Sequence, residues 1–253
     1  MEAEMLLEKI PTLKNNGSAN FEPQVSGKIF RSSAKETLRR CIIEHIGQSD
    51  FPCVGAKSAL AQGGLTILTV GAISATSDDL RIHDALLRLG SVDDAGVQSF
   101  RSLAVIFAGP QNLREPDFET ALWRRLGALM AEDRQRGYNY APDFSDDPDD
   151  PHFALSFGGQ AMFAVGLHPQ ASRKARRLPF PAIMFNPHDQ FKRLRAEQNY
   201  ERMREVILTR DADLDGEPNP MVARHGEISE ARQYSGRAVG SNWRCPLSPR
   251  GAK

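Results

Sequence analysis

The densest group of chemically capable side chains lies between residues 156 and 191. His168 ends an apolar run, and Pro169 follows it without an amide hydrogen, which ends a strand. Five polar residues come next: Ser172, Arg173, Lys174, Arg176 and Arg177. A guanidinium binds a carboxylate or phosphate through two parallel hydrogen bonds, so this cluster predicts an anion clamp beside an imidazole. That combination suits a metal centre that carries carboxylates, of which haem with its two propionates is an example.

The apolar run before His168 alternates with the period of a strand, so its two faces can be separated. The bulky residues share one face, which we expect in the core: Phe163, Val165 and Leu167. The opposite face carries Met162, Ala164, Gly166 and His168. Small residues beside a histidine predict room for a flat ligand against the sheet. On spacing alone, a hydrogen-bonded structural histidine and a solvated basic loop stay open as alternatives.

Two further side chains are candidates for metal ligation or catalysis. His188 falls in the first turn of a predicted helix, where the dipole disfavours the imidazolium and favours the neutral ring that iron requires. Cys53, in FPCVGAK, is expected near a helix N-terminus with Lys57 close by, and both features lower a thiol pKa. A thiolate there would ligate iron or act as a nucleophile, and a buried inert thiol is the alternative.

Other histidines and cysteines carry weaker signals. Cys41 and His45 are four residues apart on one helical face, as in a metal pair, but both fall on the apolar stripe, which favours core packing. His83 and His225 have no supporting neighbour in the sequence. No GxxxxGK[ST] or GxGxxG motif is present, so a nucleotide-binding loop has no support.

Two loops complete the candidate set. The acidic, proline-broken segment YNYAPDFSDDPDDPH contains Asp143 and Asp146 and is expected on the surface. The segment EARQYSGRAVGSNWRCP alternates aromatic and arginine residues, including Arg232 and Tyr234. It stays ordered only where its rings and guanidiniums find pockets, so it either closes over a ligand or forms a plain C-terminal arm.

These residues need a scaffold, and the pattern predicts a single α/β (mixed α+β) domain with a central mixed sheet, flanking helices and an irregular C-terminal arm. Residues 1–30 are predicted to form an N-terminal arm and residues 31–253 the domain. Strands are expected at 66–71, 103–108, 152–158, 161–168 and 181–185, with a hairpin at Gly158-Gly159-Gln160. Helices are expected from Ser33, at 78–89, at 116–136 and from 187 to about 209, the last capped by Asn186.

Composition bounds the partners of the chain. Its 253 residues carry 32 basic and 32 acidic side chains, which argues against a nucleic-acid binder. It has no apolar stretch of about 18 residues for a membrane span, and its acidic first residues do not resemble a secretory leader. Three cysteines are too few and odd for a disulfide framework, so we expect a cytoplasmic protein.

Three segments together resemble the YqcI/YcgG family: FPCVGAK, the block from Ser156 to Arg195, and EARQYSGRAVGSNWRCP. Members of that family include haem-dependent N-hydroxylases of guanidine-bearing amino acids. The resemblance implies haem b, O2, an electron donor and an amino-acid substrate such as arginine, and a homodimer is compatible with it. A non-catalytic haem carrier or sensor is the alternative, and a hydrolase or transferase with Cys53 as its nucleophile is a third.

On this resemblance His168 is expected to be the proximal iron ligand, because the arginine cluster adjoins it. His188 and Cys53 remain alternatives for the axial position, and these three are the candidate catalytic residues. The residues expected to bind the cofactor are Phe157, His168, Ser172, Arg173, Arg176 and Arg177. The residues expected to bind the substrate are Asp143, Asp146, Arg232 and Tyr234.

Overall fold

The computed structural model describes residues 24–91, 100–222 and 226–247, with side chains from Ser33 onward. The chain divides into two units at Ala34, and the sheet and the candidate site lie in the second, Lys35–Lys253. Helix α1, Gln24–Gly47, begins inside the predicted N-terminal arm, and the rest of that arm lies outside the described residues. No helix of the described ranges is both long and apolar enough to cross a membrane.

A five-stranded mixed sheet forms the centre of the domain, as predicted. The strands are β1 (Leu65–Ala72), β2 (Ser102–Gly109), β3 (Leu155–Phe157), β4 (Gln160–Leu167) and β5 (Ala182–Pro187), in the spatial order β1-β2-β5-β4-β3. β1 and β2 are adjacent and parallel, and a helix lies between them in the sequence. The remaining pairs of neighbouring strands are antiparallel. The β-branched and apolar residues of β1 and β2 suit a sheet that is covered on both faces.

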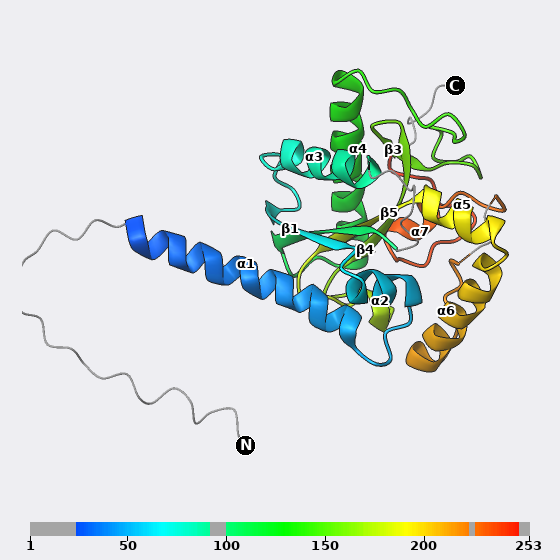
Figure 1. The fold of residues 1–253 in the computed structure, drawn as a ribbon, viewed down its shortest axis with the longest axis horizontal. Coiled ribbons are helices and arrows are strands. Elements are labelled where there is room, and N and C mark those ends of the chain that lie inside the picture. Colours follow the sequence, from blue (N-terminus) through cyan, green and yellow to red (C-terminus); the bar gives the residue numbers. More distant parts are fainter. Residues whose placement is uncertain (1–23, 92–99, 223–225, 248–253) are drawn as a thin grey trace, which may run out of the picture. The chain divides into compact units, whose positions relative to one another are not determined.

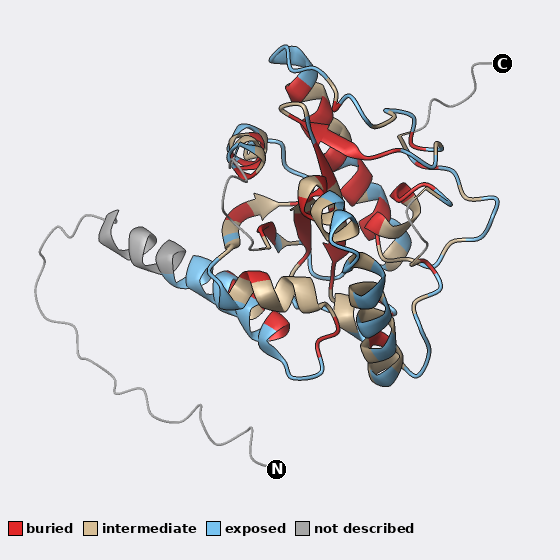
Figure 2. Ribbon diagram, turned by 45° about the vertical axis from the view of Figure 1, so that its right-hand side comes forward, coloured by how far each residue is buried: buried red, intermediate tan, exposed pale blue. Residues whose placement is uncertain are grey.

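Helices α3 (Asp79–Gly90) and α4 (Glu115–Gln135) cover one face of this sheet (Figure 1). α4 follows the predicted bounds because a proline opens its first turn and its apolar residues recur at helical spacing. Four of these apolar residues are fully buried: Phe118, Leu122, Leu126 and Leu129. They join apolar residues of the strands in one hydrophobic cluster. Figure 2 shows buried residues concentrated in the strands and in the helices packed against them.

The opposite face of the sheet is covered by the second half of α1 and by α2 (Val54–Ala61). Ile42 and Ile46 of α1 pack with Ala104 and Met184, the residues of β2 and β5 that alternate with those facing α4. Each central strand thus contributes to two separate clusters, as the period of two requires.

The β3–β4 hairpin is confirmed. Phe157 pairs with Gln160, which leaves Gly158 and Gly159 as a two-residue turn. Both glycines have positive φ angles. A turn with two successive positive φ angles favours glycine, because a side chain would strain the backbone there.

The single helix predicted from residue 187 is wrong. Asn186 and Pro187 are the last residues of β5 rather than a cap and a first helical position. Two helices follow, α5 (His188–Ala196) and α6 (Tyr200–Asp215). Gln198 separates them with a positive φ, which the interior of a right-handed helix does not accommodate. The charged pattern of this segment is helical throughout, so it gave no sign of the break.

The C-terminal arm contains one short helix, α7 (Ala231–Tyr234), and is held to the body by a buried carboxylate. Glu119 of α4 accepts hydrogen bonds from Ser235 (3.1 Å), from Arg237 Nε (3.0 Å) and from Trp243 Nε1 (3.2 Å). The arginine and the indole of the arm therefore share one buried acceptor, as expected for an arm that is ordered by its polar and aromatic side chains.

Candidate functional site

The face of β4 that was predicted to receive a ligand packs against α4 instead. Gly166 lies against α4, where an added Cβ would stand 2.7 Å from Leu122 Cδ1 and 2.7 Å from Phe118 Cε1. The small residues make room for a helix and not for a ligand. The bulky face contributes Leu167 to the core, as predicted, and also borders a cavity, where Phe163 and Val165 are half-buried. The alternation of residues in the sequence shows which side chains share a face of the strand, but it does not show which helix or cavity lies against that face.

His168 lies on the α4 side of the sheet. Its ring stacks on Phe118 with 4.3 Å between centroids and is 1% exposed. Burial lowers its pKa, and the carboxylate of Glu115 opposes that effect only in part. His168 is not among the residues that line the cavity. Phe157, also expected to bind a cofactor, is buried in the α4-side cluster.

The cavity has a volume of about 280 Å³ and lies on the other side of the sheet, between β4, β5, α2, α5 and α6. Its walls are largely apolar, with contributions from Ile42, Phe51, Phe163, Val165, Met203 and Ile207. α6 has a single buried residue, Asp211, yet the helix borders this space along most of its length, from Tyr200 onward. An apolar hollow with a few polar groups is the usual form of a small-molecule site.

Cys53 is one of those polar groups and caps α2. Its Sγ accepts a hydrogen bond from Ala56 N at 3.4 Å, so its predicted place at a helix N-terminus is confirmed. The predicted fall in its pKa is wrong: burial raises the pKa of the thiol and outweighs the helix amides and Arg176. Lys57 donates to the carbonyls of the preceding turn, including Ser49 O at 3.1 Å, rather than to the sulfur.

His188 is the second polar group, and its predicted position in the first turn of a helix is confirmed, since it begins α5. Its Nε2 lies 3.0 Å from Glu230 Oε1, and the Tyr234 hydroxyl donates to the same carboxylate oxygen. The rings of Phe144 and Phe191 contact the imidazole, with centroids 4.8 and 5.8 Å away. The side chain is buried.

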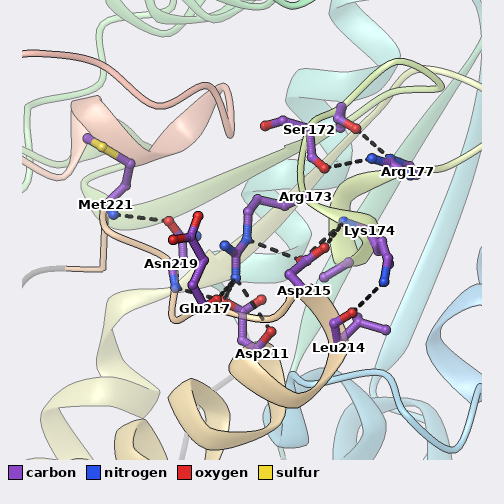
Figure 3. Close-up of polar contacts among 12 residues, drawn as sticks. Ser172, Arg173, Lys174, Arg177, Asp211, Leu214, Asp215, Glu217, Asn219 and Met221 are labelled. Atoms are coloured by element: carbon purple, nitrogen blue, oxygen red, sulfur yellow. Dashed lines mark hydrogen bonds and ion pairs between the residues drawn. The ribbon is translucent and has the colours of Figure 1, made fainter.

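Arg173 is committed to the protein itself. Its guanidinium forms ion pairs with Asp211 and, at 3.2 Å, with Asp215, both near the end of α6 (Figure 3). It also donates to Glu217 O at 2.7 Å. This arginine joins the loop after β4 to α6 and does not line the cavity.

Ser172 and Arg177 lie on the surface of the same loop. Arg177 donates to the carbonyls of Ala171 (2.7 Å) and Ser172 (2.8 Å), and the amide of Ser172 donates to Glu115 (2.8 Å). Neither is among the cavity-lining residues. The structure thus distributes the predicted arginine clamp over separate places instead of joining it in one site.

Arg176 is the arginine of the cluster that reaches the cavity. It donates to the carbonyls of Gly166 (3.0 Å) and Gln233 (3.3 Å), and burial lowers its pKa to about 10, which leaves it cationic at neutral pH. Arg195 and Arg204 of α5 and α6 also line the space. Within the described residues, none of these three guanidiniums forms an ion pair with a carboxylate.

The aspartates expected to receive a substrate lie elsewhere. Asp143 is exposed and pairs with Lys192 at 2.6 Å, which confirms the predicted surface loop. Asp146 borders a separate hollow beside Arg134. In the described chain the carboxylates that border the cavity are those of Asp211 and Glu230.

The C-terminal candidates flank the cavity without lining it. Arg232 donates to Gly240 O and lies over the Trp243 ring, 5.4 Å from its centroid. Tyr234 is fully buried in the α4-side cluster and reaches the site through Glu230 and through the Phe163 ring, with 5.4 Å between ring centroids. The sequence did not identify Glu230 as a site residue, although Glu230 is the first residue of the EARQYSGRAVGSNWRCP segment. Its proximity to His188, which is distant in the sequence, has no sequence signal.

His45 and His83 have structural roles in this fold. His45 bonds Ala175 O at 2.9 Å, and Cys41 packs among the α1-side apolar residues, which confirms core packing for that pair. His83 does have a neighbour, Asp133, whose Oδ1 lies 2.6 Å from its Nε2. His225 lies outside the described residues.

The described residues contain no group of three or more His, Cys, Asp or Glu side chains placed to hold a metal ion. A family model, that of the YqcI/YcgG family, matches residues 41–248. The matched range includes the sheet, Cys53 and His188 of the cavity wall, and the described part of the C-terminal arm. No curated protein and no solved structure matches the chain. The match extends over most of the sequence, and the chain therefore belongs to the YqcI/YcgG family.

Proposed function

We propose that this protein is a haem-dependent monooxygenase that hydroxylates a guanidine or amine nitrogen of arginine or a related amino acid, with O2 and external electrons. The observation that carries the proposal is the composition of the cavity wall. An imidazole, a thiol and three guanidiniums that form no ion pair within the described chain border one apolar space: His188, Cys53, Arg176, Arg195 and Arg204.

These residues fit haem. The porphyrin supplies four of the iron ligands, so the protein needs only one or two donors and no three-residue metal site. Apolar walls suit the ring, and guanidiniums suit the two propionates. When bound, haem would supply the binding and activation of O2.

His188 would hold the haem iron, with Cys53 as the alternative, in place of His168. Phe118 covers the His168 ring on the far side of the sheet, whereas His188 borders the cavity. A metal-ligating histidine commonly donates its other ring hydrogen to a carboxylate, and Glu230 is such a partner. The Cys53 thiol holds its proton more tightly than a free thiol because burial raises its pKa, which makes it the weaker candidate.

The other residues of the wall would bind and position the substrate. Haem has two propionates, whereas the described wall has three arginines: Arg176, Arg195 and Arg204. One arginine is therefore available for the carboxylate of an amino-acid substrate. A cationic guanidine requires an acceptor, and Asp211 and Glu230, which also bond Arg173 and His188 respectively, are the carboxylates on the described part of the wall. The apolar side chains would exclude water and keep uncoupled oxygen chemistry low. The three free cysteines fit a reducing cytoplasm.

A visible spectrum of the haem-reconstituted chain tests the cofactor. We expect a Soret band at about 400–420 nm, the range general to haem proteins. His188→Ala is expected to lose or shift the band, and His168→Ala, a buried histidine on the other face, is the matched control and keeps it. If His168→Ala alone changes the band, the ligand assignment is wrong. If Cys53→Ala alone does so, the thiol is the ligand.

Incubation with arginine, a reductant and O2 tests the activity. A hydroxylated product supports the monooxygenase. Haem binding with no product from any guanidine or amine tested would favour the carrier or sensor. A chain that binds no haem but is rapidly alkylated at Cys53 at neutral pH would overturn the proposal in favour of a thiol nucleophile.

A further inference from the structure

A buried hydrogen-bonded network lies behind His188. Glu230 Oε1 receives the Tyr234 hydroxyl and lies 3.0 Å from His188 Nε2. All three residues are buried, with Tyr234 at 0% and Glu230 at 9% exposure. The network joins the first residue of α5 to the N-terminus of α7.

The donor and acceptor roles in this network follow from the Tyr234 hydroxyl. The phenol has one hydrogen, and it donates this hydrogen to Glu230 Oε1. Glu230 Oε1 is therefore an acceptor in this network. A contact of 3.0 Å between an accepting oxygen and His188 Nε2 requires that the ring nitrogen donates.

We infer that Glu230 is a positioning residue that holds the hydrogen of His188 on Nε2 and so presents the lone pair of Nδ1 as the reactive atom of the ring. A neutral imidazole has one protonated and one unprotonated nitrogen, and a hydrogen bond to one decides the role of the other. Nδ1 is therefore the atom that would bind iron or accept a proton. The role of Nδ1 rests on the proposed function, but the position of the hydrogen does not.

The surrounding packing restricts the alternatives. The rings of Phe144, Phe163 and Phe191 contact the imidazole, at centroid distances of 4.8, 6.4 and 5.8 Å. A 180° flip about the Cβ–Cγ bond would put Cε1 in place of Nε2 and would not bring Nδ1 to Glu230, so Nδ1 could reach the carboxylate only if the whole ring moved among these aromatic neighbours. Glu230 itself is held by Tyr234, whose ring packs against Trp123 with 5.6 Å between centroids.

The test is side-chain nitrogen NMR on the full chain before haem is added, at about pH 8, where an ordinary imidazole is neutral. His188→Gln identifies the signals of the residue. In the wild type we expect a protonated Nε2 whose hydrogen exchanges slowly enough with water to be observed, and an unprotonated Nδ1. A protonated Nδ1 in the wild type would overturn the inference.

Variants separate this role from a merely structural one. In Glu230→Ala the Nε2 hydrogen signal is expected to be lost to fast exchange, and in Glu230→Gln, whose amide oxygen still accepts, it is expected to return. Tyr234→Phe keeps the carboxylate and is expected to retain the signal. An unchanged signal in a folded Glu230→Ala chain contradicts the inference. Since no haem is present, these outcomes do not depend on whether haem later binds.

Discussion

Arg173 could serve in a ligand clamp or in structural ion pairs, and replacing it tests which of these two roles it has. The sequence places it in an anion clamp, whereas its guanidinium is bonded to Asp211, Asp215 and Glu217 O. The side chains of the three charged residues are 11%, 8% and 8% exposed, so solvent screens the pairs little. Arg173→Ala would leave two buried carboxylates without their cation.

Breaking a buried ion pair by removing one partner costs about 3–5 kcal/mol. For a chain of this size each kcal/mol shifts the melting temperature by about 2–4 °C, so Arg173→Ala is expected to melt roughly 6–20 °C below the wild type. Chemical denaturation gives the free energy directly. In a double-mutant cycle, Asp215→Asn should lose much of its own effect once Arg173 is absent.

Arg177→Ala is the matched control, because this arginine is exposed and bonds carbonyls of its own loop. We expect it to cost less than about 1 kcal/mol. The reasoning fails if Arg173→Ala unfolds within about 1 kcal/mol of the wild type and yet no longer binds haem. That result would return Arg173 to the propionate clamp.

Three further predictions concern packing and protonation. Gly166→Ala is expected to destabilise the fold by about 1–3 kcal/mol, because its Cβ would overlap two side chains of α4. Chemical denaturation measures this loss. Gly47→Ala is the control and should be nearly neutral, because Gly47 has open space around it. Alkylation of Cys53 should be slower at neutral pH than that of a model thiol and should accelerate with rising pH, since burial raises its pKa; a faster rate would contradict this. The Gly71 amide lowers the pKa of Asp78 in the folded state. The ionised Asp78 side chain therefore stabilises the fold above its unfolded pKa of about 3.9, and this stabilisation is lost as the pH falls from there through the lower folded pKa. In Asp78→Asn the free energy of unfolding should consequently fall less steeply at acid pH than in the wild type.

Much of the fold was predictable because its signals are local. The length of α4 follows from a proline and an apolar stripe, and the hairpin follows from two adjacent glycines. The helix break at Gln198 was not predictable, because a charged, helix-forming sequence continues through it.

Part of the candidate site was also predictable from local features. Cys53 was expected at a helix N-terminus and His188 in a first helical turn, and both positions depend only on the residues beside them. The raised pKa of the Cys53 thiol was not predictable, since the burial that causes it comes from residues distant in the sequence.

By itself, the sequence determined which residues of β4 share a face, since alternation is a property of the extended backbone. Only the tertiary structure decided that α4 fills the face with Gly166 and that the face with Phe163 borders the cavity. It also decided that Arg173 bonds carboxylates of a distant helix while Arg176 reaches the cavity. The physical reason is that partners for a buried charge, and the layer that covers a strand, come from distant segments that local spacing does not encode.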